Sequence, residues 1–324
     1  MKKTILTAAM VAVMATAAAT QAIAQSWPER PIQLIVPFPA GSSTDTVARI
    51  IGPMMSEQLG QPVVVENRPG ASGAIGAQAV ADSNPDGYMI ALATTSTLAV
   101  APALNPNLTY DPETDFAPIG MIGISPYVLV TSKAVGAASV EELVAMATET
   151  PNRLRYASGG PASLAHLAGA LFADMAGVEL THIPYRTSAQ SVVDLAASRV
   201  DIQFGTIPPV LPHLQAESID LLAVTGAERI DLFPDTPTLQ ELGFEGYDVG
   251  LWMALIAPRD TPDDVLDALN SALNAALADG TVSEQLAAQG QSPLAGNREA
   301  LSSRISREIA TWRDVGARAG IVAN

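Results

Sequence analysis

Short apolar runs rich in β-branched residues alternate along this chain with alanine-rich segments of helical period, and this alternation constrains the fold more than any other feature. Strands that alternate with helices form mainly parallel sheets, because each helix returns the chain to the same edge of the sheet. The chain is therefore predicted to be an α/β protein. We expect strands at residues 33–36, 63–66, 89–93, 126–131, 155–157, 180–184, 200–204, 221–225 and 252–257.

Helix-capping residues stand between these runs. Thr44 or Asp45 is expected to cap a helix that ends at Gly60, where a left-handed glycine can stop it. Acidic residues in a first helical turn are favoured by the helix dipole, and a Ser-x-x-Glu pattern closes a capping box. Further helix starts are expected at Ser139, at Thr261–Asp264 and at Asn297, whose helix should run to about Gly320.

The first residues are typical of a secretory signal peptide. Lys2 and Lys3 precede an apolar stretch, residues 5–19, and Ala22-Ile23-Ala24 gives the small-x-small cleavage pattern. The sequence has no cysteine, which excludes disulfides and a lipid anchor on an N-terminal cysteine. No later window is apolar over about 18 residues. We predict that residues 1–24 are removed and that the mature protein is periplasmic and soluble.

Removal of residues 1–24 leaves 300 of the 324 residues, which at about 100–200 residues per domain predicts two lobes. The apolar run 119–130 is long enough to leave one sheet and enter another, and a second crossing is expected near 221–227. Two crossings make one lobe discontinuous and leave a ligand cleft between the lobes. The expected division is residues 25–124 with 226–324 in the first lobe, and 125–225 in the second.

The charge balance excludes several partners. The chain has 17 basic and 33 acidic residues, and loss of Lys2 and Lys3 leaves 15 basic residues against the same 33 acidic ones. Such an acidic surface repels nucleic acid and anionic membranes, so no nucleic-acid partner is expected. The three histidines, His166, His182 and His213, have no metal-ligand spacing. We expect neither a metal nor a cofactor, and a monomer.

Four turns rich in small and hydroxyl residues follow predicted strands and open helices, at residues 39–45, 94–97, 158–163 and 186–188. Helix starts offer unpaired N–H donors and a partial positive charge, and Ser and Thr add further donors. Because parallel strands gather such turns at one edge, together they predict an anion site, and a carboxylate suits it as a strong acceptor. Each turn alone is also compatible with an ordinary helix cap.

An enzyme is the main alternative class. The chain has no G-x-S-x-G motif, and Ser163 and His166 share a helix face without an acidic third partner. The glycine-rich stretch 70–76 follows a strand, but it departs from the G-x-G-x-x-G fingerprint, so a tight turn with close helix packing is favoured over a nucleotide site. A secreted hydrolase and a ligand-sensing protein that signals to a membrane receptor stay open as alternatives.

Several ordered motifs make the chain recognisable as a whole. It resembles the Bug/TctC family, the extracytoplasmic receptors of tripartite tricarboxylate transporters. The resemblance implies a type II periplasmic-binding-protein fold, a carboxylate held by loop hydroxyls and main-chain amides, and integral membrane transporter subunits as partners. The motifs are Trp27-Pro28-Glu29-Arg30-Pro31-Ile32, Val36-Pro37-Phe38-Pro39-Ala40-Gly41-Ser42-Ser43-Thr44-Asp45, Asn67-Arg68-Pro69-Gly70-Ala71-Ser72-Gly73, Pro85-Asp86-Gly87-Tyr88, His182-Ile183-Pro184-Tyr185 and Pro234-Asp235-Thr236-Pro237-Thr238.

The chain departs from the family pattern in two loops. Ser42-Ser43 stands where the family commonly has a glycine pair, and Phe204-Gly205-Thr206 stands where it often has Phe-Asp-Asn. Without that acidic residue, we expect a ligand that has no amino group: a di- or tricarboxylate, or an aromatic carboxylate packed against Phe38. Alternatively, Gly205 serves only a backbone turn.

The candidate ligand-binding residues lie in or next to the loops described above. Arg186 either reaches the cleft or stays solvated. The expected ligand-binding residues are Phe38, Ala40, Gly41, Ser42, Ser43, Asp45, Thr95, Ser96, Ser158, Gly159, Ser163, His166, Tyr185, Gly205 and Thr206.

Overall fold

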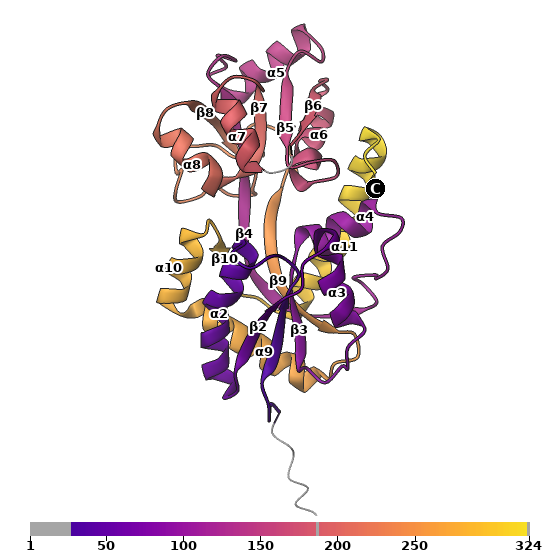
Figure 1. Ribbon diagram of the computed structural model, residues 1–324. Coiled ribbons are helices and arrows are strands. Elements are labelled where there is room, and N and C mark those ends of the chain that lie inside the picture. Colours follow the sequence, from indigo (N-terminus) through magenta and orange to yellow (C-terminus); the bar gives the residue numbers. More distant parts are fainter. Residues whose placement is uncertain (1–26, 186–187, 323–324) are drawn as a thin grey trace, which may run out of the picture.

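The computed structural model describes residues 27–185 and 188–322, which form two α/β lobes joined by two long strands (Figure 1). The lobe drawn lower in Figure 1 contains the first strands, and the upper lobe contains the middle of the chain. The joining strands are β4 (Phe116–Ser132) and β9 (Gly250–Pro258), which pair antiparallel. The predicted α/β fold with two lobes is confirmed.

In the first lobe both faces of the sheet are buried, which explains the continuous apolar run of its first strand. Leu34 and Val36 pack with one core cluster under the helices, whereas Ile35 belongs to the cluster on the other face. The elements are β1 (Ile32–Val36), α2 (Ser43–Leu59), β2 (Val63–Asn67), the 3₁₀ turn η1 (Ala71–Gly73), α3 (Ala74–Ala81), β3 (Met89–Thr94), the π-helical η2 (Ser96–Val100), α4 (Ala101–Leu104), α9 (Asp263–Ala278), α10 (Gly280–Ala288), β10 (Ser292–Pro293) and α11 (Arg298–Ala319).

The second lobe is also a sheet with helices on both faces. Leu143, Leu167 and Phe172 pack on one face, and Val192 and Val210 on the other. The elements are α5 (Val140–Glu149), β5 (Arg155–Ser158), α6 (Leu164–Ala176), β6 (Thr181–Pro184), α7 (Ser188–Ala196), β7 (Ile202–Thr206), α8 (Ile207–Gln215) and β8 (Ile219–Val224).

Strand directions make the loops of the two lobes face each other. The strand order is β2-β1-β3-β9-β4-β7-β5-β6, and β8 and β10 also pair with β4. β1 is parallel to β2 and β3, and β5 is parallel to β6 and β7. The pairs β3–β9, β9–β4 and β4–β7 are antiparallel, so β1 to β3 run toward the second lobe and β5 to β7 run toward the first. The carboxyl ends of both parallel sets therefore point into the space between the lobes.

The crossing between the lobes is fixed at Tyr127, Thr225 and Val249. β4 pairs with β9 up to Pro126 and with β7 from Tyr127 onward, which confirms the predicted crossing within residues 119–130. The Thr225 hydroxyl lies 2.8 Å from Tyr127 O and 2.6 Å from Val249 O, so it links the two strands where they cross. The return crossing lies at Val249–Gly250, and the prediction that placed it near residues 221–227 is wrong.

The segment 226–249 packs on the second lobe. Thr238 forms a β-bridge with Val224, and the Tyr247 hydroxyl donates a hydrogen bond to Ala168 O of α6 at 2.8 Å. These contacts favour a second lobe that extends to Val249, against the expected limit at 225. No sequence pattern indicated this attachment, because the segment has almost no regular secondary structure.

The C-terminal helix α11 contacts both lobes. Glu308, which is buried, accepts hydrogen bonds from Trp252 Nε1 on β9 and from Arg304 Nε, both at 2.7 Å. Burial raises the pKa of Glu308, while Arg304 and Trp252 oppose that rise. Near the end of α11, Arg318 forms an ion pair of 3.3 Å with Asp174 on α6. The helix therefore ties the crossing strand β9 to the second lobe.

All three of these expected helix starts are confirmed, but a side-chain cap is present at only two of them. Ser139 Oγ accepts a hydrogen bond from Glu142 N at the start of α5, and Asn297 Oδ1 caps α11. At α9 the residue before the helix is Pro262, and no side chain caps it. The Thr261 hydroxyl instead donates to Pro258 O at 2.8 Å.

Candidate ligand-binding site

The loops that follow β1, β2 and β3 meet at one edge of the first lobe. Gly73 has φ +98°, and a Cβ at this position would lie 2.5 Å from Thr97 Cγ2 and 3.4 Å from Phe38 Cζ. The glycine thus allows the turn after β2 to touch the loops after β1 and β3. This geometry supports the packing role expected for the glycine-rich stretch 70–76.

The loop after β1 ends in a helix start with free donors. Ser42 is the N-cap of α2, and its Oγ accepts a hydrogen bond from Asp45 N at 3.2 Å; the expected cap at Thr44 or Asp45 is wrong. The amides of Ser43 and Thr44 have no hydrogen-bond partner among the described residues, as the first turn of a helix requires. The Ser43 side chain is exposed, as are Ala40 and Gly41 beside it.

Asp45 supports this loop from inside. Its carboxylate, 3% exposed as a residue, accepts hydrogen bonds from Gly41 N at 2.8 Å and Asn67 Nδ2 at 2.9 Å, and it pairs with Arg49 at 3.0 Å. The hydrogen bond from Arg49 and those from Gly41 and Asn67 lower the pKa of Asp45 to about 2, against the effect of burial. Asp45 thus shapes the loop rather than presenting a carboxylate to the space between the lobes.

Of the two hydroxyl residues expected after β3, the structure leaves one available. Thr95 is 0% exposed, and its Oγ1 donates to Gly250 O at 3.2 Å and accepts from Trp252 N at 2.9 Å. It therefore joins this loop to the crossing strand β9 instead of facing a ligand. The neighbouring Ser96 is partly exposed, and its side chain has no hydrogen bond to another described residue.

In the second lobe, residues 158–163 form what we call the Ser158 loop, between β5 and α6. Ser158 is 1% exposed, and its Oγ lies 3.0 Å from Gly160 O and 3.1 Å from Gly160 N. Ser163 Oγ donates to Gly160 O at 2.7 Å and accepts from His166 N at 3.3 Å, so Ser163 is the N-cap of α6. Gly159 and Gly160 are partly exposed, whereas Ser158 holds the loop from within.

Two imidazoles lie behind the Ser158 loop. The rings of His166 and His182 stack with centroids 3.6 Å apart and planes 7° apart. His182 Nε2 is 2.6 Å from Ser158 Oγ, and His166 Nδ1 accepts a hydrogen bond from Ala162 N at 3.2 Å. Burial, together with the neighbouring His182, lowers the pKa of His166 to about 4, and burial also lowers the pKa of His182.

The loop after β6 is described only in part. Tyr185 N donates to Ser158 O at 2.9 Å, and the Tyr185 hydroxyl donates to Asp194 Oδ2 of α7 at 2.9 Å. Tyr185 is half-buried beside the Ser158 loop, where a Cβ on Gly160 would lie 3.6 Å from Tyr185 O. Arg186, for which a position at the cleft and a solvated one both stayed open, lies outside the described residues, as does Thr187.

Gly205 and Thr206 end β7, opposite Val128 and Tyr127 of β4. Gly205 is buried, and a Cβ on it would lie 3.0 Å from Gln203 Nε2. Thr206 is the residue before α8, is partly exposed and makes no side-chain cap. Thr206 is therefore a further hydroxyl donor at the carboxyl end of the second sheet.

Sequence reasoning missed two residues at this edge. His182 was not among the expected ligand-binding residues, although Tyr156 pairs with His182 across parallel strands and Ser158 follows two residues later on the same face. The alternation of β5 could have indicated this contact. Gln203, 1% exposed, has an Oε1 atom without a partner among the described residues and lies beside Gly205 on the same strand face.

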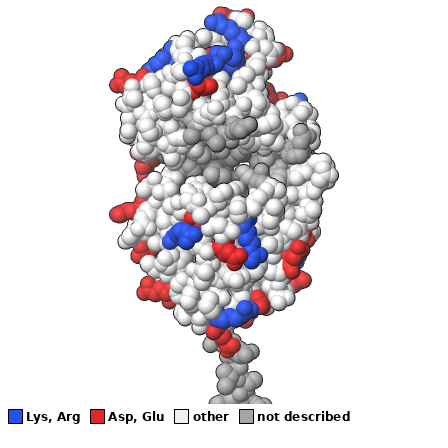
Figure 2. All heavy atoms as spheres, in the orientation of Figure 1, with Lys and Arg blue, Asp and Glu red and all other residues white. Residues whose placement is uncertain are grey.

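The described parts of the facing loops carry neutral donors. Residues 37–43, 95–96, 158–163 and 205–206 include no lysine or arginine. On the face shown in Figure 2, the surface narrows between the lobes. Among the described residues, no group of three or more His, Asp or Glu side chains is placed to hold a metal. No helix within the described ranges is long and apolar enough to cross a membrane.

Comparison with known proteins identifies the family. Residues 47–320 match the tripartite tricarboxylate transporter family receptor, TctC. Protein BugT of Bordetella pertussis is 38% identical over 300 residues, which cover 91% of this chain and 92% of BugT. An R. palustris protein solved with adipate is 36% identical with TM-score 0.77, over 91% of this chain and 99% of that chain.

A second solved structure, MatC of Rhodopseudomonas palustris with bound malate, is 31% identical with TM-score 0.73, over 89% of this chain and 99% of that chain. Together with the two lobes and the facing loops, the matches cover almost the whole described chain. The chain belongs to the TctC family of solute receptors of tripartite tricarboxylate transporters.

Proposed function

We propose that this protein is a periplasmic receptor that holds a small dicarboxylate between its lobes and delivers it to a tripartite tricarboxylate-type membrane transporter. The observation that carries the proposal is the facing of the two sets of loops, which present neutral hydroxyl and amide donors to one space. The free amides of Ser43 and Thr44, the hydroxyls of Ser43 and Ser96, and the hydroxyl of Thr206 supply these donors. Such donors bind a carboxylate without a cationic side chain.

Two facing donor sets fit a ligand with an acceptor at each end. Relatives in the same family were solved with adipate and with malate, and both ligands are dicarboxylates. A glycine at position 205 places no acidic side chain beside the ligand, so a second carboxylate meets no repulsion there. A dicarboxylate without an amino group is therefore the favoured ligand class.

The geometry favours binding over hydrolysis. Ser158 and His182 are within hydrogen-bond distance, as a nucleophile and its base would be, but Ser158 is 1% exposed and its oxygen also contacts Gly160. Within the described residues no carboxylate is hydrogen-bonded to either ring of the stacked histidines. A buried serine with no acid behind its histidine lacks the access and the third member that a hydrolase needs.

Export, partners and oligomeric state belong to the same proposal. The signal-like segment 1–24 directs the chain to the periplasm, where it acts as a monomer that meets the transporter subunits after loading. Intact mass of the protein recovered from periplasmic extract should correspond to a chain that begins after Ala24. Recovery with Met1 retained, or only with membranes, would contradict export.

The ligand class is tested by a thermal-shift panel followed by calorimetry. The panel contains adipate, malate, succinate, citrate and benzoate, with aspartate and glutamate as amino-substituted counterparts. At a ligand concentration of about 100 times Kd, binding stabilises the folded state by about 2.7 kcal/mol, which raises Tm measurably. Tighter binding of aspartate or glutamate than of every unsubstituted acid would contradict the proposal.

The donor set is tested by single substitutions. Ser43→Ala, Ser96→Ala and Thr206→Val should each weaken binding of the preferred acid about ten- to a hundred-fold, because each removes a hydrogen bond to a charged group. Ser271→Ala, at an exposed site on α9, is the matched control and should leave affinity unchanged. Unchanged affinity in all three loop variants would place the ligand elsewhere.

A further inference from the structure

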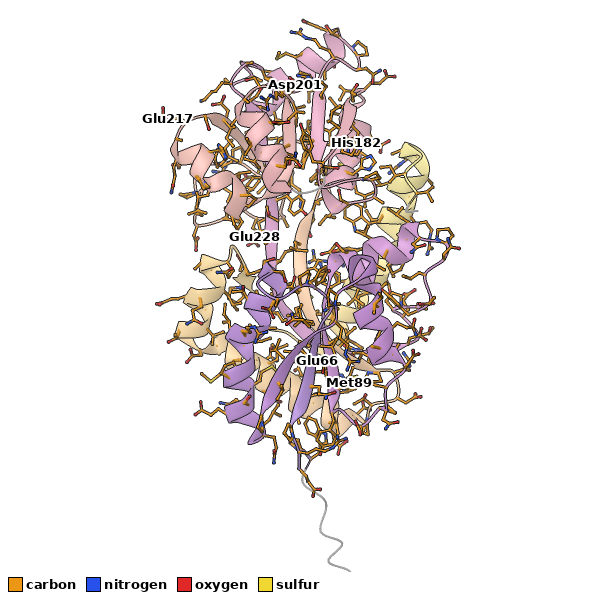
Figure 3. The ribbon with its side chains drawn as sticks, in the orientation of Figure 1. Glu66, Met89, His182, Asp201, Glu217 and Glu228 are labelled. Carbon is orange, nitrogen blue, oxygen red and sulfur yellow. The ribbon has the colours of Figure 1, made fainter. Side chains whose placement is uncertain are left out.

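The two stacked histidines hold opposite ends of the Ser158 loop. His182 Nε2 contacts Ser158 Oγ at 2.6 Å, at the start of the loop, and His166 Nδ1 accepts from Ala162 N at 3.2 Å, near its end. The rings lie face to face at 3.6 Å, so a movement of either ring moves its partner. Figure 3 shows His182 on the side of the second lobe nearest the end of α11.

These contacts define the protonation of the pair. His166 Nδ1 accepts a backbone N–H, so the neutral ring must carry its proton on Nε2. A second proton would go to Nδ1 and would meet the Ala162 N–H donor. A charged His166 would also lie 3.6 Å from the His182 ring, and two imidazolium rings at that separation repel each other. The observed loop geometry therefore requires an uncharged His166, and it disfavours a charge on both rings.

Neither carboxylate in the cavity around the pair is hydrogen-bonded to one of the two rings. The rings line a cavity of about 420 Å³ between the second lobe and α11, together with Tyr156, Asp174, Glu179 and Arg318. Asp174 is paired with Arg318 at 3.3 Å, and Glu179 Oε2 accepts from Asn152 Nδ2 at 2.6 Å. Tyr156 lies with its ring centroid 5.0 Å from that of His182, and burial raises the pKa of Tyr156, which keeps it neutral.

We propose that His166 and His182 are positioning residues for ligand binding: they clamp the Ser158 loop in its binding geometry only while His166 is neutral. The proposal rests on the proposed function, because it takes the Ser158 loop as one wall of the carboxylate site. Protonation of the pair releases Ala162 N and separates the rings. The loop then loses its shape as a wall of the site, and the carboxylate is released.

The direction of the effect follows from the lowered pKa values. Each histidine gives up its proton more readily in the folded protein than at its ordinary pKa of 6.5, so the clamp is intact above pH 6.5. As the pH falls from 6.5 toward 4, the pair takes up protons that the folded loop disfavours. Affinity for a carboxylate should therefore fall across this range beyond the loss caused by protonation of the ligand itself.

The test compares pH profiles of adipate binding. In the double variant His166→Asn with His182→Gln, the asparagine Oδ1 replaces the acceptor Nδ1 at position 166. The glutamine amide replaces the hydrogen-bonding Nε2 at position 182. Neither amide side chain takes up a proton in this pH range. Between pH 7.5 and 3.0, which spans the lowered pKa of His166 at about 4, the wild-type Kd should rise about tenfold more than the Kd of the double variant, as expected for the loss of one to two loop hydrogen bonds. Protonation of adipate itself affects the Kd of both proteins equally, so it cancels when the two pH profiles are compared.

The third histidine provides the matched control. His213 lies on α8 with its Nδ1 3.2 Å from Ser218 Oγ, away from the stacked pair. His213→Gln should keep the wild-type pH profile. The proposal would be overturned if the wild type and the double variant showed the same pH dependence of Kd. It would also be overturned if His213→Gln, and not the double variant, removed the pH dependence.

A measurement without ligand separates this inference from the proposed function. In ¹⁵N spectra of the free wild-type protein, the Gly160 and Ala162 amides should shift with the same midpoint as the His166 and His182 ring nitrogens. His166 should also show the Nε2–H tautomer at pH 7.5. If adipate does not bind but these signals titrate together, the ligand assignment fails and the clamp stands. If the amides stay unchanged while the rings titrate, the clamp is wrong.

Discussion

Asp45 shows at the scale of one residue how a buried carboxylate shapes a loop that should hold a ligand. Asp45→Asn keeps the size of the side chain but removes the charge that Gly41 N, Asn67 and Arg49 share. We expect the free energy of unfolding at pH 7 to fall by about 1–3 kcal/mol, the cost of weakened hydrogen bonds to a charged group. Urea unfolding followed by circular dichroism measures this difference.

The pH dependence of the same variant is a sharper test. The pKa of Asp45 is lowered from 3.8 to about 2, so its stabilising effect is complete above pH 3.8 and is lost as the pH falls through 2. The stability gap between the wild type and Asp45→Asn should therefore close between pH 4 and pH 2. Asp260→Asn, at an exposed site, should show little gap at either pH. A gap that persists at pH 2 would mean that Asp45 acts by shape and not by charge.

Helix N-caps were predicted correctly in some places and wrongly in others. The sequence near a helix start identifies the N-cap residue only where a single candidate is present. Ser42, Ser43, Thr44 and Asp45 can all cap a helix, and the choice of Ser42 depends on Gly41 reaching the carboxylate of Asp45. At Ser139 the single Ser-x-x-Glu pattern left no rival, and the prediction was correct. Ring stacking of His166 on His182 depends on the register of β5 and β6, which no local pattern fixes.

At the scale of elements, Thr95 is a hydrogen-bonding link between two strands. β3 pairs with β9 as far as Thr94 and Met253, and beyond that point the Thr95 hydroxyl continues the ladder to Gly250 O and Trp252 N. Thr95→Val keeps the volume but leaves both backbone groups unpaired in a buried site. We expect a loss of about 1–3 kcal/mol in the free energy of unfolding, measured by urea titration.

A second buried threonine is the matched control for Thr95. Thr131 on β4 is 0% exposed, but its Oγ1 has no partner among the described residues. Thr131→Val should therefore be neutral or stabilising, since it removes an unpaired buried hydroxyl. Equal destabilisation in both variants would show that volume or β-propensity, not the hydroxyl contact, sets the cost.

The contact of the three loops of the first lobe depends on Gly73. Gly73→Ala must bring a Cβ within 2.5 Å of Thr97 Cγ2 at a φ of +98°, so we expect the unfolding free energy to fall by more than about 2 kcal/mol and adipate affinity to fall with it. Gly136→Ala has φ +72° with nothing within 4 Å of the added Cβ, and it should cost only about 1 kcal/mol of backbone strain. Calorimetric Tm values compare the two; equal costs would argue against a close approach of the loops.

Strands were the most predictable elements because runs such as 33–36 and 63–66 are β-branched and bounded by turn residues. The long strand β4 could also be predicted, since a strand that pairs in the sheets of both lobes requires an apolar run longer than an ordinary strand. The partner of each strand in the sheet could not be inferred from the sequence. Attachment of residues 226–249 to the second lobe rests on Thr238 with Val224 and on Tyr247 with α6, contacts without a periodic signal.

At the scale of the whole molecule, the two crossing strands should act as a hinge. Because β4 and β9 pair side by side and Thr225 bridges them at Tyr127 and Val249, bending there can bring the facing loops together without unfolding either lobe. Small-angle X-ray scattering should show a smaller radius of gyration at saturating adipate than without ligand. Lysine at the same concentration is the control. An unchanged radius in the presence of calorimetrically confirmed adipate binding would contradict hinge closure.

The return of the chain to the first lobe at Gly250 also has a consequence for folding order. β3 cannot complete its sheet until β9 exists, and Thr95 waits for partners that lie 155 and 157 residues later in the chain. The second lobe, by contrast, pairs β5 with β6 and β7 within one continuous segment. Closing long loops is slow, so amides of β5 and β6 should become protected from hydrogen exchange before those that join β3 to β9 during refolding. A chain exported from its N-terminus would then keep the β9-facing edge of β3 unpaired until its last third has crossed the membrane, and binding of an export chaperone to residues 89–94 would be most useful during that interval.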